Sequence, residues 1–126
     1  MNVKSPTGST QEEAHAFLAK YPEVQGIDII MTDCHGIGRG KIIRRHELEA
    51  LFASGRPMPA SLFGQDVAGD DVDGTGLVLH DGGGDKRCWP VPGTLGLQPH
   101  LDRGQVLVSM YEPEGQPFCA DPLPVL

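Results

Sequence analysis

The chain has 126 residues, of which 39% are hydrophobic and 21% charged, and its formal net charge is −7. This size and composition are typical of one globular domain with its own core. The negative charge argues against a nucleic-acid partner, because phosphate binding needs a basic face. No segment approaches the roughly 18 apolar residues that a membrane helix needs, so we expect no membrane partner. Three cysteines without CxxC spacing favour reduced thiols and a cytoplasmic location.

A flexible lead is predicted for residues 1–8, followed by one domain over 9–126. The segment STQEEAHAFLAKYP predicts a helix. Ser9 or Thr10 can act as its N-cap, each with a glutamate three residues later, and Pro22 ends it. Four apolar residues fall on one stripe of this helix, which we expect to face the core: Ala14, Phe17, Leu18 and Tyr21.

A β-hairpin and a second, short helix are predicted next. In EVQGIDIIMTD the residues Ile27, Ile29 and Met31 alternate with more polar positions, which indicates a strand. CHGIG has turn chemistry, and RGKIIRR resumes as a second strand. HELEALFASG then predicts a helix that ends near Gly55 and turns three side chains inward: Leu48, Leu51 and Phe52.

The second half of the chain reads as loops and strands. Residues 56–76 are expected to form a long loop, and GLVLHDGGGDKRCWPVP a hairpin around a glycine-rich turn. TLGLQPHLDRG is expected to be irregular, and QVLVSMYEPEGQPF contains a strand with Val106, Val108 and Met110 on one face. Trp89 is expected to be a core or interface anchor. Mixed hairpins with one or two packed helices predict the α+β class.

The segment DCHGIGRGK raises the question of a chemical site. Asp33, Cys34 and His35 are consecutive, and no second cluster of ligands shows zinc spacing. The phosphate-binding loop pattern fails as well, because His35 stands at the required first glycine and Ile42 at the required hydroxyl residue. A hairpin turn with Gly36 at positive φ is the simpler interpretation.

Two other glycine-rich segments also lack the residues that a site needs. GDDVDGTG resembles a calcium loop, but Gly69 stands at the first ligand position and His80 at the final acidic one. DGGGDK could cradle an anion, but a plain turn between two strands is the favoured interpretation. No nucleophile–base pair can be placed from the sequence. The residues alone therefore predict neither a catalytic residue nor a metal ligand in this domain.

Four segments occur in an order and at spacings that resemble a known family: DCHGIGRGKIIRRHEL, ASLFGQDVAGDDV, RCWPVPGTL and MYEPEGQPFCADPLPVL. Together they are similar to the N-terminal β-grasp domain of the glutamine synthetase superfamily, in particular of its γ-glutamylpolyamine synthetase-like branch. The resemblance covers residues 10–126. It implies a β-grasp (ubiquitin-like) mixed sheet packed against one or two helices. It also implies that Asp33, Gly36, Arg39 and Gly40 mark a hairpin between the first two strands.

The resemblance implies that the chemistry lies outside this domain. Family members make an acyl phosphate from glutamate and ATP, and an amine then attacks it. ATP, Mg or Mn ions and glutamate bind in a larger C-terminal domain, so we expect no cofactor here and no activity from the chain alone. The expected partners are its own catalytic domain and neighbouring subunits of a homo-oligomeric ring. The alternative is a free-standing β-grasp module that binds other proteins, and a metal-binding module is a weaker third possibility.

A loop of the β-grasp domain closes the amine site of a neighbouring subunit in this family. By the resemblance, that loop contains Phe63, Gly64 and Asp66, which we expect to bind substrate. Phe63 stands where ammonium-using members carry an aspartate, and Asp66 stands where they carry a hydroxyl residue. A phenyl ring cannot accept a proton but can pack on a carbon chain, which favours an alkylamine or polyamine. A plain core or interface position explains Phe63 equally well. Leu62, Phe63 and Trp89 are expected to be exposed and to promote self-association.

Overall fold

The computed structural model describes residues 5–32, 36, 38–59, 85–98, 100, 102–112, 115–118 and 121. Its helices are α1 (Gln11–Lys20), the 3₁₀ turn η1 (Arg45–Glu47) and α2 (Leu48–Ser54). Its strands are β1 (Gly26–Thr32), β2 (Gly38–Arg44), β3 (Arg56–Pro59), β4 (Asp85–Pro90), β5 (Gly96–Gln98) and β6 (Arg103–Tyr111). Within these ranges no helix is long and apolar enough to cross a membrane.

The strands form one mixed sheet in the order β2-β1-β6-β4-β3, and β5 also pairs with β6. β1 and β2 form the predicted antiparallel hairpin, with Ile27 opposite Ile43. β1 and β6, which come from the two ends of the chain, run parallel at the centre of the sheet. A parallel central pair flanked by antiparallel strands is the topology expected of a β-grasp domain. The predicted α+β class and β-grasp architecture are confirmed.

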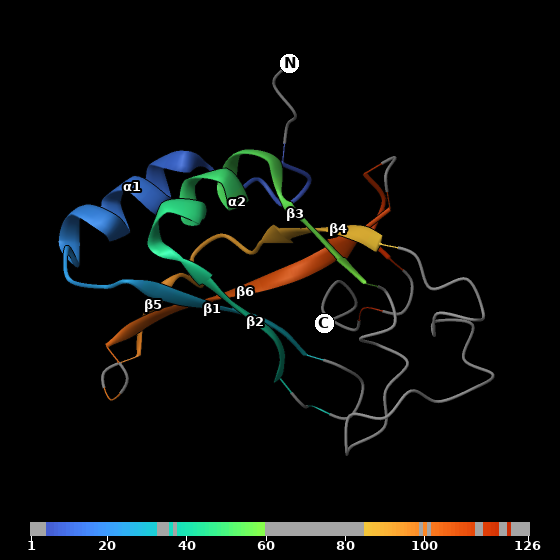
Figure 1. The fold of residues 1–126 in the computed structure, drawn as a ribbon. Coiled ribbons are helices and arrows are strands. Elements are labelled where there is room, and N and C mark those ends of the chain that lie inside the picture. Colours follow the sequence, from blue (N-terminus) through green and yellow to red (C-terminus); the bar gives the residue numbers. More distant parts are fainter. Residues whose placement is uncertain are drawn as a thin grey trace.

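Both helices lie on the same face of the sheet and cover its core (Figure 1). α1 contributes the buried Ala14 and Phe17, and α2 contributes the three inward residues that the sequence predicted. They pack on alternate strand residues, which is the period expected for one covered face of a sheet. The fully buried strand residues of this core include Ile27, Ile29, Met31, Met58, Cys88, Val106 and Met110.

β6 is the central strand of the sheet, and different segments pair along each of its two edges. On one edge, β1 pairs with residues 104–107. Further along β6, residues after the strand bond to it instead. Phe118 N–H donates to the Met110 carbonyl, and the buried Asp121 carboxylate accepts from Met110 N–H at 2.8 Å. The other edge pairs with β5 and then with β4. The last described residues are therefore held against the sheet.

Several predictions about local structure need correction. The expected loop after residue 55 begins with β3, and the expected irregular segment contains β5, because both find partners in β4 and β6. Thr10 is the N-cap of α1, but its side chain makes no capping bond. Its proposed partner Glu13 instead accepts a hydrogen bond from the Gly93 N–H at 3.0 Å.

Trp89 is only 3% exposed, so the expectation that it belongs to an exposed docking face is wrong, whereas its role as a buried anchor is confirmed. The flexible lead predicted for residues 1–8 stays a prediction. Within it, the Thr7 hydroxyl donates to the Pro90 carbonyl at 2.6 Å. Ser5 and Ser9 join that hydroxyl in a short network.

Candidate functional site

The loop expected to bind substrate, with Phe63, Gly64 and Asp66, lies outside the described residues, and so does Leu62. The structure does describe both ends of the segment that carries it. β3 ends at Pro59 and β4 begins at Asp85, and these two residues are paired across the antiparallel ladder. The segment 60–84 therefore leaves and re-enters the sheet at one place. The pairing of β3 with β4 therefore fixes the base of this segment, the residues Pro59 and Asp85 on either side of it.

Contacts from three directions hold the base of this segment. Met58 and Cys88 are fully buried, which fixes the inner face of β3 and β4 in the core. Lys86 Nζ bonds to the Glu112 carboxylate at 2.9 Å, and lies 5.6 Å from the centre of the Phe118 ring. Arg87 donates to the Ser54 carbonyl at the end of α2 at 2.6 Å. These contacts fix the two residues, Pro59 and Asp85, between which segment 60–84 lies in the chain.

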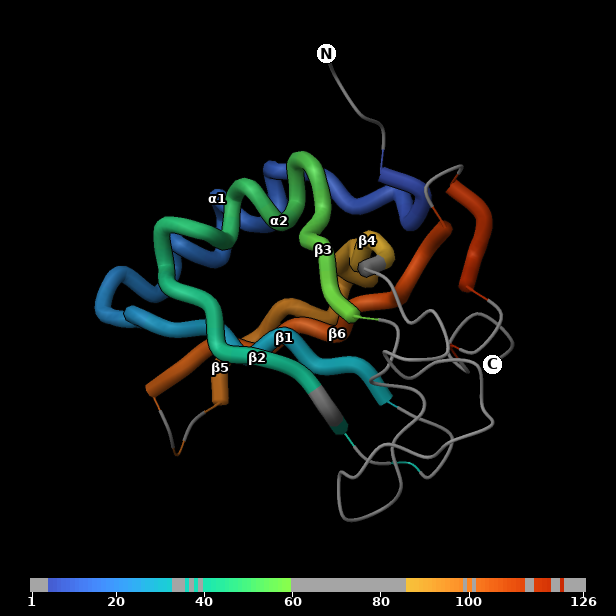
Figure 2. The backbone as a smooth tube through the Cα atoms, turned by 45° about the vertical axis from the view of Figure 1, so that its right-hand side comes forward, coloured from blue at the N-terminus to red at the C-terminus, as the bar shows by residue number. Residues whose placement is uncertain are grey.

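The β1–β2 hairpin ends on the same side of the molecule as β3 and β4. Figure 1 and Figure 2, turned by 45° from each other, both show the end of β1 and the start of β2 on the side where β3 ends. Gly36, within the predicted turn, has φ +75°, as the turn interpretation required. Asp33, Cys34 and His35 lie outside the described residues. The ends of β1 and β3 and the starts of β2 and β4 thus lie on one side of the sheet.

The described residues offer little catalytic chemistry. They contain no group of three or more His, Cys, Asp or Glu side chains that could hold a metal ion. Cys88, the free cysteine that the structure describes, is buried beside Met31, with its sulfur 3.5 Å from the Met31 sulfur. Burial first, and then the charge of Asp121, raise the pKa of the Cys88 thiol to about 12. A thiol that stays protonated at neutral pH is a poor nucleophile.

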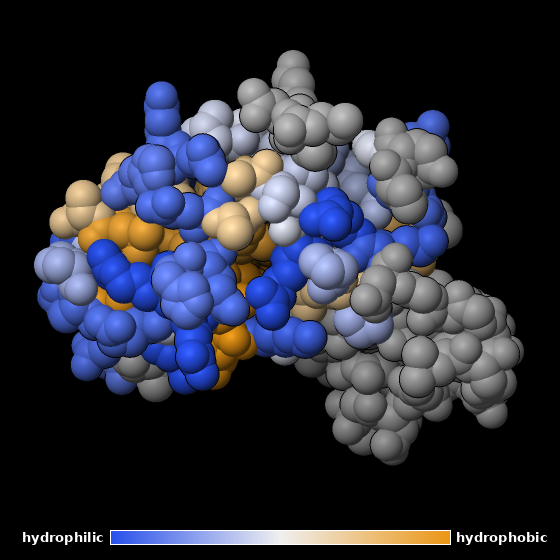
Figure 3. All heavy atoms as spheres, turned by 45° about the horizontal axis from the view of Figure 1, so that its top comes forward, coloured by the Kyte–Doolittle hydropathy of each residue, from blue (hydrophilic) through white to orange (hydrophobic). Residues whose placement is uncertain are grey.

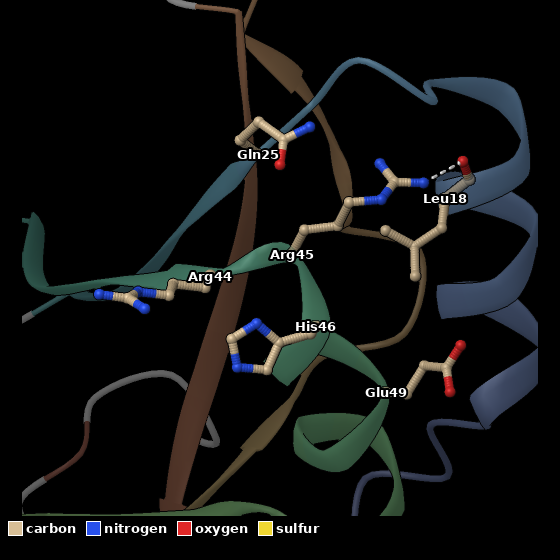
Figure 4. Close-up of a pocket in the computed structure, with 6 residues that line it drawn as sticks. All are labelled: Leu18, Gln25, Arg44, Arg45, His46 and Glu49. Atoms are coloured by element: carbon tan, nitrogen blue, oxygen red, sulfur yellow. Dashed lines mark hydrogen bonds between the residues drawn. The ribbon is translucent and has the colours of Figure 1, made fainter.

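A second concave surface lies at the opposite end of β2, where the strand passes into η1. This cavity of about 670 Å³ is lined by Leu18 of α1, Gln25 and the consecutive residues Arg44, Arg45 and His46, with Glu49 of α2 (Figure 4). Sequence reasoning did not select these residues as a site. The signal was the basic run RRH directly after a strand, in a chain with a net charge of −7.

The fold and the site define an α+β β-grasp domain that holds an inserted segment at one end of its sheet. Solved structures with this fold include the GmaS/ADP complex (TM-score 0.60, 18% identity, 83% of this chain and 21% of that chain). They also include a novel glutamine synthase homolog, with a TM-score of 0.64 and 22% identity over 82% of this chain and 25% of that chain. A third is Plasmodium falciparum glutamine synthetase, with a TM-score of 0.60 and 17% identity over 95% of this chain and 22% of that chain. At these identities, the likeness establishes the fold.

A comparison of sequences gives a closer relationship than the comparison of structures. The chain is 36% identical over 118 residues to gamma-glutamylputrescine synthetase PuuA of Escherichia coli, a match that covers 91% of this chain. The resemblance to the N-terminal β-grasp domain of the glutamine synthetase superfamily, and to its polyamine-related members, is therefore confirmed. The chain spans about a quarter of the length of that curated relative, 25%. No protein-family model matches the chain.

Proposed function

We propose that this chain is the N-terminal domain of an ATP-dependent glutamate–amine ligase of the glutamine synthetase family. The observation that carries the proposal is the 36% identity to a gamma-glutamylputrescine synthetase over nearly the whole chain. In this proposal, ATP, Mg or Mn ions and glutamate bind to a catalytic domain outside these residues. The complete enzyme works in the cytoplasm as a homo-oligomer. The chain alone is inactive.

The domain's part in the reaction is to close the amine site at a subunit interface. The support is the β3–β4 pairing, which fixes both ends of segment 60–84. A lid that excludes water protects an acyl phosphate from hydrolysis, which competes with attack by the amine. The proposal assigns Phe63 to packing on the carbon chain of the amine. It assigns Asp66 to attracting the positively charged amine or its distal nitrogen.

The activity is tested on the product of the complete reading frame. ATP hydrolysis is measured with glutamate and, in turn, putrescine, ethanolamine or ammonium. The expected result is hydrolysis that depends on glutamate and on an alkylamine or diamine, and no hydrolysis by the 126-residue chain. A reading frame that ends at Leu126 would overturn the proposal and favour a free-standing binding module. ATP hydrolysis by the isolated chain would also overturn it.

The loop assignment is tested separately by Phe63→Asp in the complete enzyme. Restoring an acid at this position should raise the ratio of kcat/KM for ammonium over that for putrescine by at least about tenfold, or about 1.4 kcal/mol. Leu62→Asp is the matched control, because it makes the same change one residue earlier. Equal effects of the two variants, or a wild-type enzyme that prefers ammonium, would contradict the role of Phe63.

A further inference from the structure

We infer that the cavity at the junction of β2, η1 and α1 is a binding site for a small oxyanion, a carboxylate or phosphate held by Arg44 and His46. The site is separate from the proposed amine lid, because it lies at the end of β2 opposite to the β1–β2 turn. Its volume of about 670 Å³ falls within the usual range of small-molecule sites.

The first argument is that the wall of the cavity is already rigid. The Arg45 guanidinium donates to the carbonyls of Leu18 at 2.7 Å, Tyr21 at 2.8 Å and Val24 at 2.9 Å. The Arg45 backbone N–H donates to the Gln25 carbonyl at 2.9 Å. All these acceptors are neutral carbonyls, so within the described residues the Arg45 guanidinium is held in place without a carboxylate partner. A preorganised wall reduces the entropy lost when a ligand binds.

The second argument is that the Arg44 and His46 side chains beside Arg45 are exposed and can reach a ligand. Figure 4 shows Arg45 reaching toward the Leu18 backbone of α1, whereas the Arg44 and His46 side chains extend away from α1. Both are exposed, and neither forms an ion pair with another residue in the part of the chain that the structure describes. The nearby Glu47 carboxyl has its pKa lowered first by the backbone hydrogen bond from Arg44 and then by the charges of Arg56, His46 and Arg44. Glu47 accepts from the Arg44 backbone N–H at 2.9 Å, and Glu49 pairs with His15 at 3.1 Å.

The third argument concerns the chemistry that these residues would recognise. An arginine fork and an imidazole suit the planar oxygens of a carboxylate or phosphate. Gln25 adds an amide donor, and Leu18 offers an apolar surface for a short carbon skeleton. Viewed from the helix side, hydrophilic side chains cover much of the molecule and leave apolar patches between them (Figure 3). The ligand class is therefore a small organic acid or a phosphate ester rather than a nucleic acid or a membrane.

The test is a titration of the ¹⁵N-labelled chain with inorganic phosphate and, separately, with malonate, at constant ionic strength set by sodium chloride. We expect saturable shifts of the Gln25 and Arg45 amide signals with a Kd of about 1 mM for the preferred anion. The anion that saturates at the lower concentration identifies the source, phosphate or carboxylate. The double variant Arg44→Gln, His46→Gln should weaken binding by at least about fivefold.

Lys41→Gln is the matched control, because Lys41 is an exposed cation on β2 that does not line this cavity. It should leave the Kd unchanged within about twofold, since it changes only the general charge of the surface. Linear shifts without saturation for both anions, or equal weakening by Lys41→Gln and the double variant, would overturn the inference. The double variant changes only exposed side chains, and its own spectrum reports whether it folds.

Discussion

At the scale of single residues, Gly40 explains part of the segment DCHGIGRGK, which the sequence analysis singled out. Gly40 lies in β2 opposite Ile30 and is exposed, so burial does not select it. A Cβ atom added at Gly40 would collide with the backbone carbonyl of Ile29, because it would lie only 2.9 Å from the carbonyl carbon. Backbone atoms of a paired central strand cannot move aside easily. The glycine is therefore required by the close approach of two strands rather than by metal or phosphate binding.

We predict that Gly40→Ala lowers the free energy of unfolding by about 2–3 kcal/mol, the range for overpacking in a tight site. Urea denaturation measures it. Gly96→Ala is the control, because Gly96 also lies in a strand but a Cβ atom added there would meet nothing within 4 Å. A similar loss of stability in both variants would point to strand propensity rather than to the contact with Ile29.

Burial lowers the reactivity of the Cys88 thiol, because it disfavours the thiolate form. Its thiol, with a pKa of about 12, stays protonated under native conditions. We predict that iodoacetamide at about pH 9, near the ordinary pKa of a thiol, leaves Cys88 unmodified in the native chain and modifies it in guanidinium chloride, as read by peptide mass spectrometry. Native modification at the rate of the unfolded chain would show that the thiol is accessible.

The same pKa predicts a dependence of stability on pH. The unfolded thiol has the ordinary pKa of 9.0, and the folded thiol has a raised one. The contribution of Cys88 is therefore fully present below pH 9 and decreases as the pH rises toward 12, by up to about 1.4 kcal/mol per pH unit. Cys88→Ala should remove this part of the slope, which urea titrations at about pH 8 and about pH 10 can compare with the wild type.

At the scale of elements, Arg45 connects the start of α2 with the end of α1. The last carbonyls of a helix lack partners within the helix, and a cation near them is favourable. Arg45 supplies three donors to the carbonyls of Leu18, Tyr21 and Val24. The side chain thus fixes how α1 turns into β1, which no local sequence pattern indicated.

We predict that Arg45→Ala destabilises the chain by about 2 kcal/mol, since it removes three charge-assisted hydrogen bonds to the carbonyls of Leu18, Tyr21 and Val24. Arg45→Lys should recover less than half of this loss, because an ammonium group cannot reach three carbonyls in the same fork geometry. Thermal unfolding followed by circular dichroism measures both. Arg44→Ala is the control, and its exposed side chain should change stability by less than about 0.5 kcal/mol. An equal loss from Arg44→Ala would contradict this role of Arg45.

At the scale of the whole molecule, β2 and β3 lie at the two ends of the described sheet, and the short β5 pairs only with β6. Ile42 of β2 is 59% exposed, and it is the large hydrophobic residue that the structure leaves exposed within the described ranges. Open strand edges with apolar side chains promote pairing with other chains. This edge, rather than Trp89, is therefore the described surface that can support the predicted self-association.

We predict that the chain self-associates at high concentration and that Ile42→Lys reduces this, because a lysine on an edge strand opposes edge pairing. Sedimentation velocity over a concentration series measures the effect as a smaller rise in the weight-average sedimentation coefficient. Leu97→Lys is not a suitable control, because Leu97 packs against the core. Lys41→Gln on the same strand is suitable. A wild-type chain that stays monomeric throughout would contradict the prediction.

Local patterns predicted the elements whose residues carry the information themselves. The alternation of β1 and β6, the inward residues of α2, the end of that helix near Gly55 and the positive φ of Gly36 were predicted because each depends on neighbours in sequence. The ordered motifs predicted the β-grasp fold and the superfamily, which the comparisons confirmed. The substrate roles of Phe63, Gly64 and Asp66 stay predictions, because these residues lie outside the described ranges.

Other features depended on residues that are distant in sequence. β3 and β5 are too short to show a period, and they exist because β4 and β6 offer backbone partners. The Arg44–His46 cavity forms only once α1, β2, η1 and α2 come together. Trp89 is buried in the folded chain, where β4 pairs with β6. The sequence by itself determined which segments could be helix or strand, since that depends on side-chain period and turn chemistry. Only the tertiary structure decided which strands pair and which charged groups face a cavity, because those depend on contacts across the whole chain.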